Sequence, residues 1–422
     1  MEEYSGEKEH YDVVIVGAGI AGLGTSLGLH RLGIGRILVL ESADSLRVTG
    51  FALGLWPNAW RALDALGIGQ YLRETHLQLT GVVSTSANSG LPTSDTTFAA
   101  VPSRGDLNVG CVVRKALLET LANELPQGTI RYSSKVVRIQ NQGCTFKSIH
   151  LEDGTYLTTK VLIGCDGVNS VVADHLGFSR PSFVGRSAVR GFVHYEDGHG
   201  FDPKLFFFFG RGVRYGIIPC NDHGLYWFLT FSPSPQENNA AEKGIEEDPI
   251  KLKQFILSKL GKVPDRFRAV FERTELESMV CAPLRFRHPW ELLWGNISKD
   301  GVCLAGDALH PMTPDIGQGA CAALEESVIL ARELAQALKT NHSSDSLEKE
   351  QRRIENSLEK YARERRWRSV DLVSTAYMVG VMQQSHGAVM NFLRDKIMAK
   401  FLVGAQMKKA DFDCGTLTAS AS

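Results

Sequence analysis

Two glycine-containing segments, far apart in the chain, carry the residue types that hold a dinucleotide. The first, Gly17-Ala18-Gly19-Ile20-Ala21-Gly22, follows an apolar stretch at residues 11–16 and opens a stretch with helical spacing at residues 20–32. In such a strand–turn–helix the first glycine permits a tight turn, the second lets the backbone approach a pyrophosphate, and the third lets the helix pack on the strand. The free N–H groups and the dipole of the helix N-terminus then stabilise the phosphates. The segment therefore predicts a dinucleotide site.

An acidic residue ends the next predicted strand, at residues 36–41. Glu41 lies nineteen residues after Gly22, where its carboxylate can accept hydrogen bonds from ribose hydroxyls. A carboxylate at this place also disfavours a 2′-phosphate, which favours FAD or NAD over NADP. The first segment by itself leaves FAD and NAD as alternatives.

The second segment places an acid at the end of another buried strand. Residues 301–305 are apolar, and Gly306-Asp307-Ala308-Leu309-His310-Pro311 follows them, with Gly317-Gln318-Gly319 shortly after. A further motif, LIGCDGVNS, lies between the two segments at residues 162–170. In this order the three motifs resemble the FAD-dependent monooxygenases of the aromatic-hydroxylase type, and within them the branch of zeaxanthin epoxidases, urate hydroxylases and salicylate hydroxylases. The resemblance covers residues 13–368.

The resemblance implies that the second segment binds FAD. Asp307 bonds the ribityl chain, which suits a carboxylate acceptor, and Pro311 lies near flavin C4a, where a hydroperoxide forms. The helix N-terminus after residues 317–319 points at N1 and the C2 oxygen of the flavin, where N–H groups stabilise an anionic reduced ring. The remaining implied contacts are Gly306, Gly317, Gln318, Gly319, Ala320, Cys321, Arg114 at the start of the third helix, Arg47 near the adenosine, and Val136 through its backbone.

The Asp166-Gly167 pair has two interpretations. In the family the pair serves FAD and NAD(P)H handling, whereas Asp-Gly is also common in a strand-to-helix turn. The family usually continues with an arginine three residues after the serine, and this chain has Ala173 after Ser170. The substitution leaves FAD binding in place and calls a contact with the pyridine nucleotide at this position into question.

The order of the elements predicts an α/β fold with a Rossmann-like FAD-binding domain of the aromatic-hydroxylase (GR2) type. Short aromatic-rich strands between residues 183 and 231 predict an inserted antiparallel β-sheet that forms the substrate domain, and C-terminal helices follow. We expect the discontinuous FAD-binding domain at residues 1–80, 104–180 and 283–340, the sheet domain at residues 81–103 and 181–282, and the helical segment at residues 341–422. Further expected elements are helices at residues 57–66, 113–125, 324–338 and 347–360, strands within residues 130–139 and 146–163, and a loop at residues 232–249.

Composition excludes several classes of function. The chain has 46 basic and 47 acidic side chains among 422 residues, which argues against nucleic acid as the partner. The eight cysteines include no C-x-x-C pair, so we expect reduced thiols and no metal site. Residues 1–10 lack the apolar core of a signal peptide, and no stretch approaches the ~20 apolar residues of a membrane span. We therefore expect a cytoplasmic protein.

The aromatic sheet is expected to form a roof over the flavin. Residues 206–209 are four phenylalanines that place rings on both faces of one strand, one face for the core and the other for packing or for lining an aromatic pocket. Tyr195, Tyr215 and Tyr226 are candidates for activating a phenol, and the sequence does not choose among them. His310 is interpreted as structural or as facing the cofactor.

Three further patterns have plainer interpretations. Gly210-x-Gly212 has no helix after it and predicts a turn rather than a second nucleotide site. Residues 363–368 are predicted to form a solvated helix face. Residues 389–403 mix apolar and basic side chains, which favours packing against the body or a partner subunit and leaves peripheral contact with a membrane surface as the alternative.

The sequence therefore predicts an FAD monooxygenase that takes electrons from NAD(P)H, a transient cosubstrate. One oxygen atom of O2, carried by the flavin C4a-hydroperoxide, would enter an apolar or aromatic small molecule by hydroxylation or epoxidation. The alternatives are another enzyme on the same fold, such as an isoprenoid reductase or a halogenase, and a non-catalytic binding protein. The halogenase pattern Trp-x-Trp-x-Ile-Pro is missing, and the intact residues 306–319 argue against the binding protein.

Overall fold

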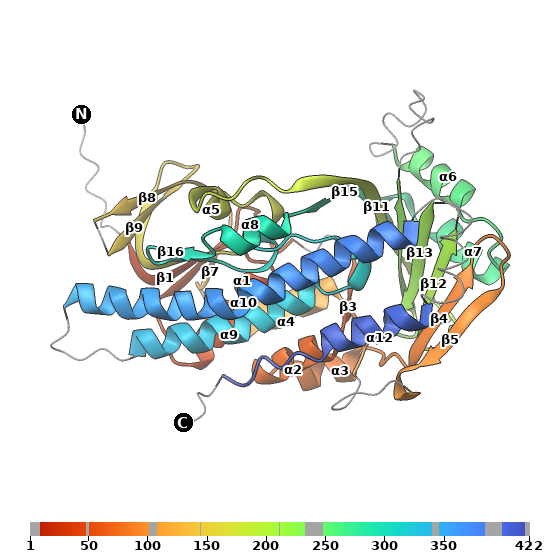
Figure 1. The fold of residues 1–422 in the computed structure, drawn as a ribbon, viewed down its shortest axis with the longest axis horizontal. Coiled ribbons are helices and arrows are strands. Elements are labelled where there is room, and N and C mark those ends of the chain that lie inside the picture. The colour runs from red at the N-terminus through yellow and green to blue at the C-terminus, as the bar shows by residue number, and fades with distance from the viewer. Residues whose placement is uncertain are drawn as a thin grey trace.

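The computed structural model of the chain describes residues 9–47, 50–100, 108–143, 145–210, 212–232, 248–339, 346–384 and 399–417. Two sheets lie at opposite ends of its long axis, and the long helix α10 (Leu347–Gln384) runs from one to the other (Figure 1). Most of the predicted loop at residues 232–249 and of the amphipathic segment at residues 389–403 lies outside the residues whose packing is described.

The first sheet has eight strands, in the order β16-β17-β10-β1-β2-β7 with β9 and β8 branching from β10. The five strands from β17 to β7 run parallel, and the last four residues of the central strand β1 are buried. Parallel strands need helical crossovers, which cover the sheet and bury its apolar residues. The bounds are β1 (His10–Val16), β2 (Ile37–Leu40), β7 (Ile130–Arg131), β8 (Val136–Gln142), β9 (Phe146–Leu151), β10 (Tyr156–Gly164), β16 (Ser298–Lys299) and β17 (Val302–Leu304).

Helix α1 (Ile20–Arg31) connects β1 to β2, which confirms the predicted strand–helix–strand unit. It packs closely on α9 (Gly319–Lys339) because small residues face each other. A Cβ on Gly24 would lie 2.5 Å from Ser327 Oγ, and one on Gly28 would lie 2.7 Å from Ala331 Cβ. Helix α9 begins five residues before the predicted start, and its first bonded amide, Ala322 N–H, reaches back to Gln318.

The second sheet has seven strands, in the order β15-β11-β14-β13-β12-β4-β5. All neighbours pair antiparallel except β12 and β4, which confirms the predicted inserted sheet of mainly antiparallel strands. Gly210 pairs with Val213 across the turn between β12 and β13, so the glycines there form a hairpin as predicted. The bounds are β4 (Gly81–Ser86), β5 (Pro92–Thr97), β11 (Ser182–His194), β12 (Lys204–Gly210), β13 (Val213–Pro219), β14 (Gly224–Phe231) and β15 (Met279–Phe286).

The two faces of this sheet pack on different parts of the protein. On the outer face, Phe206, Phe208 and Tyr215 form a core with Phe267 of α7 (Asp265–Arg273) and with α6 (Pro249–Lys259). On the inner face, Phe207, Phe228 and Tyr226 belong to the core that includes the first sheet. The alternation of a strand therefore sends two of the four consecutive phenylalanines, Phe206 and Phe208, outward and Phe207 inward.

Shorter elements complete the described part of the chain. A two-stranded sheet joins β3 (Ala52–Leu55) to β6 (Gly110–Val113). The helices predicted at residues 57–66, 113–125 and 324–338 are confirmed as α2, α4 and α9. The remaining helices are α2 (Pro57–Ala65), α3 (Gly69–Thr75), α4 (Arg114–Asn123), α5 (Val171–His175), α8 (Pro289–Trp294) and α12 (Ala399–Ala410), with 3-10 turns at 98–100, 167–169, 276–278, 306–308 and 314–316.

The prediction of a solvated helix face at residues 363–368 is confirmed for exposed Arg363 and Glu364 and is wrong for the arginines that follow them. Arg365 of α10 is 0% exposed, and Nη1 of Arg366 donates to three carbonyl oxygens at the end of α8. Trp367, in contrast, is 68% exposed. A charged stretch looks solvated in sequence, but these arginines face buried acids and free carbonyl groups.

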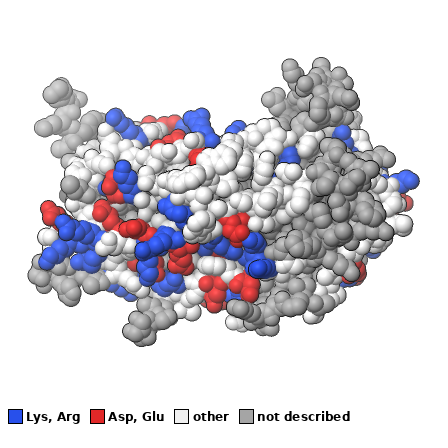
Figure 2. Space-filling model, viewed as in Figure 1, with Lys and Arg blue, Asp and Glu red and all other residues white. Residues whose placement is uncertain are grey.

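The surface carries no strong charge of one sign on the side drawn in Figure 2, where basic and acidic side chains are mixed along α9 and α10. None of the described helices is long and apolar enough to cross a membrane. The parallel first sheet and the inserted second sheet confirm the α/β class, whereas the domain boundaries given above stay a prediction.

Candidate active site

The first glycine motif has the backbone geometry that its chemistry requires. Gly17 has φ +102°, and a Cβ there would lie 2.5 Å from the carbonyl oxygen of Cys165. A Cβ on Gly22 would lie 2.0 Å from the carbonyl oxygen of Gly17, so helix α1 can start here only with glycine. Gly19, in contrast, has open space around its Cβ position. A pyrophosphate can therefore reach the backbone amides of this turn, which include those of Ile20 and Ala21 at the start of α1.

The segment around Glu41 gathers the predicted adenosine-side residues. Glu41 is 7% exposed and accepts hydrogen bonds from the amides of Ala18 (3.0 Å) and Ala43 (2.9 Å). Exposed Arg47 places Nε 3.5 Å from the same carboxylate. The Ser134 amide donates to the Glu41 carbonyl oxygen. This hydrogen bond holds the start of β8, at Val136, beside Glu41. The structure thus brings Glu41, Arg47 and the start of β8 to one edge of the first sheet.

The second motif touches the first. Gly306 has φ +61°, and a Cβ there would lie 2.9 Å from Ala21 Cβ, so the two segments meet at the start of α1. Asp307 is exposed although Gly306 and Ala308 on either side are buried. Burial lowers the pKa of Arg114, and the negative charge of Asp307 opposes that shift. Nε of Arg114 is buried without a hydrogen-bond partner.

Helix α9 begins beside Asp307. Gly317 is exposed with φ +61°, and a Cβ on Gly319 would lie 3.9 Å from Asp307 Oδ1. Gln318 is buried and accepts a hydrogen bond from Asn58 Nδ2 at 2.8 Å. Ala320 is half-buried, and burial raises the pKa of the Cys321 thiol to about 12, so this cysteine is inert packing.

Asp166 and Gly167 support both interpretations of their motif. Oδ2 of Asp166 accepts hydrogen bonds from the amides of Val171 (2.8 Å) and Val172 (3.4 Å), which caps α5. Oδ1 is buried without a partner, and burial raises the pKa of this carboxyl group. The turn also lies against the first motif, since the Cβ position of Gly17 is 3.0 Å from Asp166 Cα. Buried Ala173, at the place of the family arginine, donates its amide to Ser170 Oγ.

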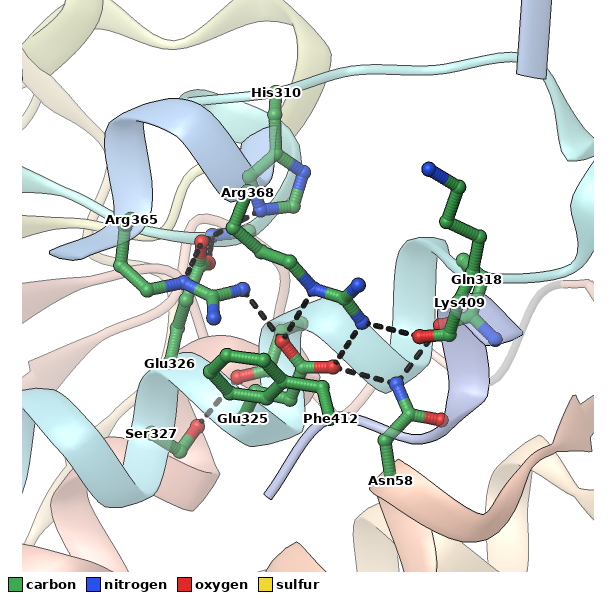
Figure 3. Close-up of polar contacts among 12 residues, drawn as sticks. Asn58, His310, Gln318, Glu325, Glu326, Ser327, Arg365, Arg368, Lys409 and Phe412 are labelled. Atoms are coloured by element: carbon green, nitrogen blue, oxygen red, sulfur yellow. Dashed lines mark hydrogen bonds and ion pairs between the residues drawn. The ribbon is translucent and has the colours of Figure 1, made fainter. Parts of the chain in front are cut away.

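His310 and Pro311 are buried directly after the second motif. His310 is 0% exposed, and its Nε2 lies 2.8 Å from Glu326 Oε1, as Figure 3 shows. Pro311 accepts a hydrogen bond from the Arg287 amide through its carbonyl oxygen. The imidazole therefore contacts α9, in keeping with the structural interpretation of this residue.

The second sheet, which is the predicted roof over the flavin, is called the roof sheet below. Only one of the three candidate tyrosines lies on its inner face. The Tyr215 hydroxyl donates to the Leu260 carbonyl oxygen on the outer face, and Tyr195 packs against the outer core and meets His199 edge to face. Tyr226 is 8% exposed on the inner face, and burial raises the pKa of its hydroxyl to about 12, a shift that the positive charge of Arg190 opposes. The sequence did not single out Tyr226, because its place on the inner face follows from the pairing of β14 with β11 and β13.

An ionic cluster that the sequence did not predict joins the roof sheet to the second motif. Asp315 is 0% exposed and binds Arg186 of β11 (2.8 Å) and Arg214 of β13 (3.2 Å). The Arg214 guanidinium also lies over the rings of Phe207 (5.2 Å) and Phe228 (5.1 Å). The roof is therefore fixed to the loop immediately before Gly317.

The arrangement fits FAD on three grounds. Gly19 has open space where a side chain would stand, and Gly317 is exposed with a left-handed backbone. Arg114 Nε and Asp166 Oδ1 are buried polar atoms without a partner, which native proteins rarely leave unsatisfied. Asp307 is exposed, and its carboxylate lies beside Gly319, where α9 begins. Among the described residues no group of three or more His, Cys, Asp or Glu could hold a metal ion.

Comparisons with known proteins identify the family. Residues 10–254 and 285–375 match the FAD binding domain family. The chain is 50% identical over 410 residues to Monooxygenase 2 of Arabidopsis thaliana, covering 96% of this chain and 98% of that protein. It is 34% identical to Monooxygenase 1 of the same plant, covering 97% and 100%. HpxO of Klebsiella pneumoniae, solved with FAD and uric acid, has the same fold, with a TM-score of 0.78, 22% identity, and 95% and 96% coverage. The chain therefore belongs to the FAD-dependent monooxygenases that carry this FAD binding domain, and FAD is its cofactor.

Proposed function

We propose that the protein is an NAD(P)H-dependent monooxygenase that inserts one oxygen atom from O2 into an apolar or aromatic small molecule, by hydroxylation or epoxidation. The observation that carries the proposal is the contact between the two motifs, where the Gly306 Cβ position lies 2.9 Å from Ala21 Cβ. This contact supports a single FAD that would lie along the turn suited to a pyrophosphate and the exposed carboxylate beside a helix N-terminus.

The chain's own residues would divide the cofactor between them. The amides of residues 17–22 would hold the pyrophosphate, and Glu41 the ribose of the adenosine. Asp307 and Arg114 would hold the ribityl chain and a phosphate, and the N-terminus of α9 would stabilise negative charge on the pyrimidine side of the ring. When bound, FAD supplies the redox chemistry with NAD(P)H and O2.

The inner face of the roof sheet would bind the substrate. Phe207, Phe228 and Tyr226 present aromatic rings there, and Arg190 adds one half-buried cation. Rings of this kind bury an apolar or aromatic molecule and keep water from the reacting atoms. The HpxO structure contains uric acid, a small heterocycle, which supports a substrate of comparable kind for the same roof.

NAD(P)H would visit the site without a domain of its own. In the described part of the chain only one strand–turn–helix carries the glycine pattern of a dinucleotide site. Ala173 removes a side chain that the family uses near Asp166, so this chain must hold the pyridine nucleotide by other residues. We also propose a cytoplasmic location for this chain, whose 46 basic and 47 acidic side chains nearly balance.

The test is the visible spectrum of the purified protein under anaerobic titration with NADPH and with NADH. We expect flavin bands that bleach with one nucleotide and return with air. Isotopically labelled O2 should then place one labelled oxygen atom in the product of a responsive aromatic substrate. A protein that retains no flavin after incubation with FAD and removal of the free cofactor would contradict the proposal. A product whose new oxygen atom comes from water would contradict it too.

A further inference from the structure

Two neighbouring glutamates in the middle of helix α9, Glu325 and Glu326, are each 0% exposed. A buried carboxylate is costly unless cations and hydrogen-bond donors surround it. Adjacent residues of a helix point about 100° apart, so the two side chains reach different surroundings. The residues that each one contacts therefore show what each carboxylate holds.

Glu326 reaches both ends of the turn that carries Asp307. Its Oε2 accepts the Gly306 amide at 2.7 Å, and its Oε1 lies 2.8 Å from His310 Nε2. The turn is closed from inside because the amides of Leu309 and His310 donate to the Gly306 carbonyl oxygen. One carboxylate thus fixes the first residue and the fifth residue of the segment, and Asp307 lies between them.

Glu325 reaches the segment before the first turn of α9 through Asn58. Nδ2 of Asn58 donates to Glu325 Oε1 at 2.5 Å and to Gln318 Oε1 at 2.8 Å. Gln318 lies between the two glycines that start α9. The second carboxylate therefore orients the side chain at the helix N-terminus that faces the predicted flavin ring.

The countercharges come from α10, as Figure 3 shows. Arg365 lies 2.7 Å from Glu325 and 3.3 Å from Glu326, and Arg368 lies 2.7 Å from Glu325. Phe412 lies under both guanidinium groups, at 5.2 and 4.8 Å. Two arginines thus balance two glutamates. Glu326 keeps Oε2 for the Gly306 amide, whereas Oε1 of Glu325 is shared between Asn58 and Arg368.

We propose that Glu326 and Glu325 are positioning residues for FAD, Glu326 for the turn with Asp307 and Glu325, through Asn58, for the start of α9. The inference rests on the proposed FAD site. Neither carboxylate need touch the cofactor, because each acts by holding the residues that do.

Glu333 offers a matched control on the same helix. It is 4% exposed and pairs with Arg332 and Lys360, at 3.5 and 2.7 Å, without touching either cofactor segment. Replacement of Glu333 by glutamine removes a buried charge from α9 just as replacement of Glu326 does. Any effect seen with Glu326→Gln and absent from Glu333→Gln therefore comes from the contacts of Glu326 and not from the helix as a whole.

The experiment compares wild type, Glu326→Gln, Glu325→Gln and Glu333→Gln for FAD affinity and for melting temperature with and without FAD. FAD stabilises the fold by an amount set by its dissociation constant, so weaker binding shrinks the FAD-linked rise. We expect Glu326→Gln and Glu325→Gln to weaken FAD binding by about tenfold or more, to shrink the rise and to shift the bands of the bound flavin. Glu333→Gln should leave the rise as in wild type.

A merely structural role would lower both melting temperatures equally and leave the FAD dissociation constant unchanged, which would overturn the proposal. If a glutamate variant does not fold, His310→Leu tests the contact of Glu326 and Asn58→Leu tests the contact of Glu325, with both glutamates in place. Normal FAD affinity in both of these variants would also overturn the proposal. Failure of wild type and Glu333→Gln to bind FAD would instead refute the proposed function.

Discussion

Residues 17–22 and residues 306–319 meet at one point, but different forces hold them there. The first segment is fixed by its own backbone, because Gly22 packs against the Gly17 carbonyl group and Gly17 against Cys165. The second is fixed by charged side chains from α9, α10 and the roof sheet, through Glu326 and Asp315. The first turn is closed by backbone packing within residues 17–22 and against the neighbouring strand end at Cys165, whereas the second depends on charged side chains from three separate parts of the chain.

The difference also separates two kinds of cost. Close packing around a glycine tolerates no added atom, and a substitution there changes the path of the chain. A buried ion pair tolerates a change of shape better than the loss of one partner, which leaves the other charge alone in an apolar interior. The substitutions below, ordered from the largest expected effect, probe each kind of support in turn.

Gly22→Val should do the most damage. Its Cβ alone would lie 2.0 Å from the Gly17 carbonyl oxygen, so α1 must move away from β1. We expect a loss of more than about 4 kcal/mol in the free energy of unfolding and no retained FAD, measured by urea denaturation and by flavin absorbance. Gly33→Ala, in open space after α1, is the control, although its φ of +77° adds a small strain. Normal flavin content in Gly22→Val would show that the first motif is not fixed by packing.

Asp315→Asn should come next, because it leaves Arg186 and Arg214 with a neutral partner in a buried place. We expect a loss of about 3 kcal/mol in the free energy of unfolding, at the lower end for a broken buried pair. Asp95→Asn, which breaks a half-exposed pair with Lys204, should cost less than about 1 kcal/mol. Equal losses of unfolding free energy in the two variants would show that the buried ion pairs of Asp315 do not fix the second segment.

Asp307→Ala should separate cofactor binding from folding. The side chain is exposed, so the FAD-free protein should keep its unfolding free energy within about 0.5 kcal/mol. The lost hydrogen bonds of a carboxylate should weaken FAD binding by roughly 10- to 100-fold. The readouts are denaturation of the apoprotein and fluorescence titration with FAD, and unchanged affinity would contradict the role given to Asp307.

The smallest effect should be a change in pH dependence. Burial alone would lower the pKa of His310, but the Glu326 carboxylate raises that pKa above the ordinary 6.5. The charged pair therefore stabilises the fold fully below about pH 6.5 and loses this contribution as the pH rises through the raised pKa. His310→Gln should flatten that decline by roughly 1 kcal/mol, measured by denaturation at stepped pH, with exposed His30→Gln as control. If the unfolding free energy of His310→Gln depends on pH as in wild type, a group other than His310 causes the decline.

Local patterns in the sequence predicted the first motif, the buried strands and the α/β class, because each depends on neighbouring residues. The support of the second motif was not predicted, since Glu325 and Arg365 are forty residues apart and both look like surface residues. One signal was available. Two adjacent acids interrupt the apolar stripe of residues 324–338, and two arginines three positions apart follow in α10. The choice of Tyr226 likewise needed the register of the roof sheet, which no single strand reveals.

The segment at residues 409–416 has a consequence for the order in which the protein is made. Arg368 donates to the Lys409 carbonyl oxygen, Arg61 of α2 to that of Phe412, and Arg332 of α9 to those of Cys414 and Thr416. Residues 17–22 leave the ribosome hundreds of residues earlier than this segment. A nascent chain can thus form its first strand–turn–helix early, but the helices behind the second motif reach their final contacts only after synthesis has passed residue 416. The packing behind the second motif is therefore completed late, after that around the first motif.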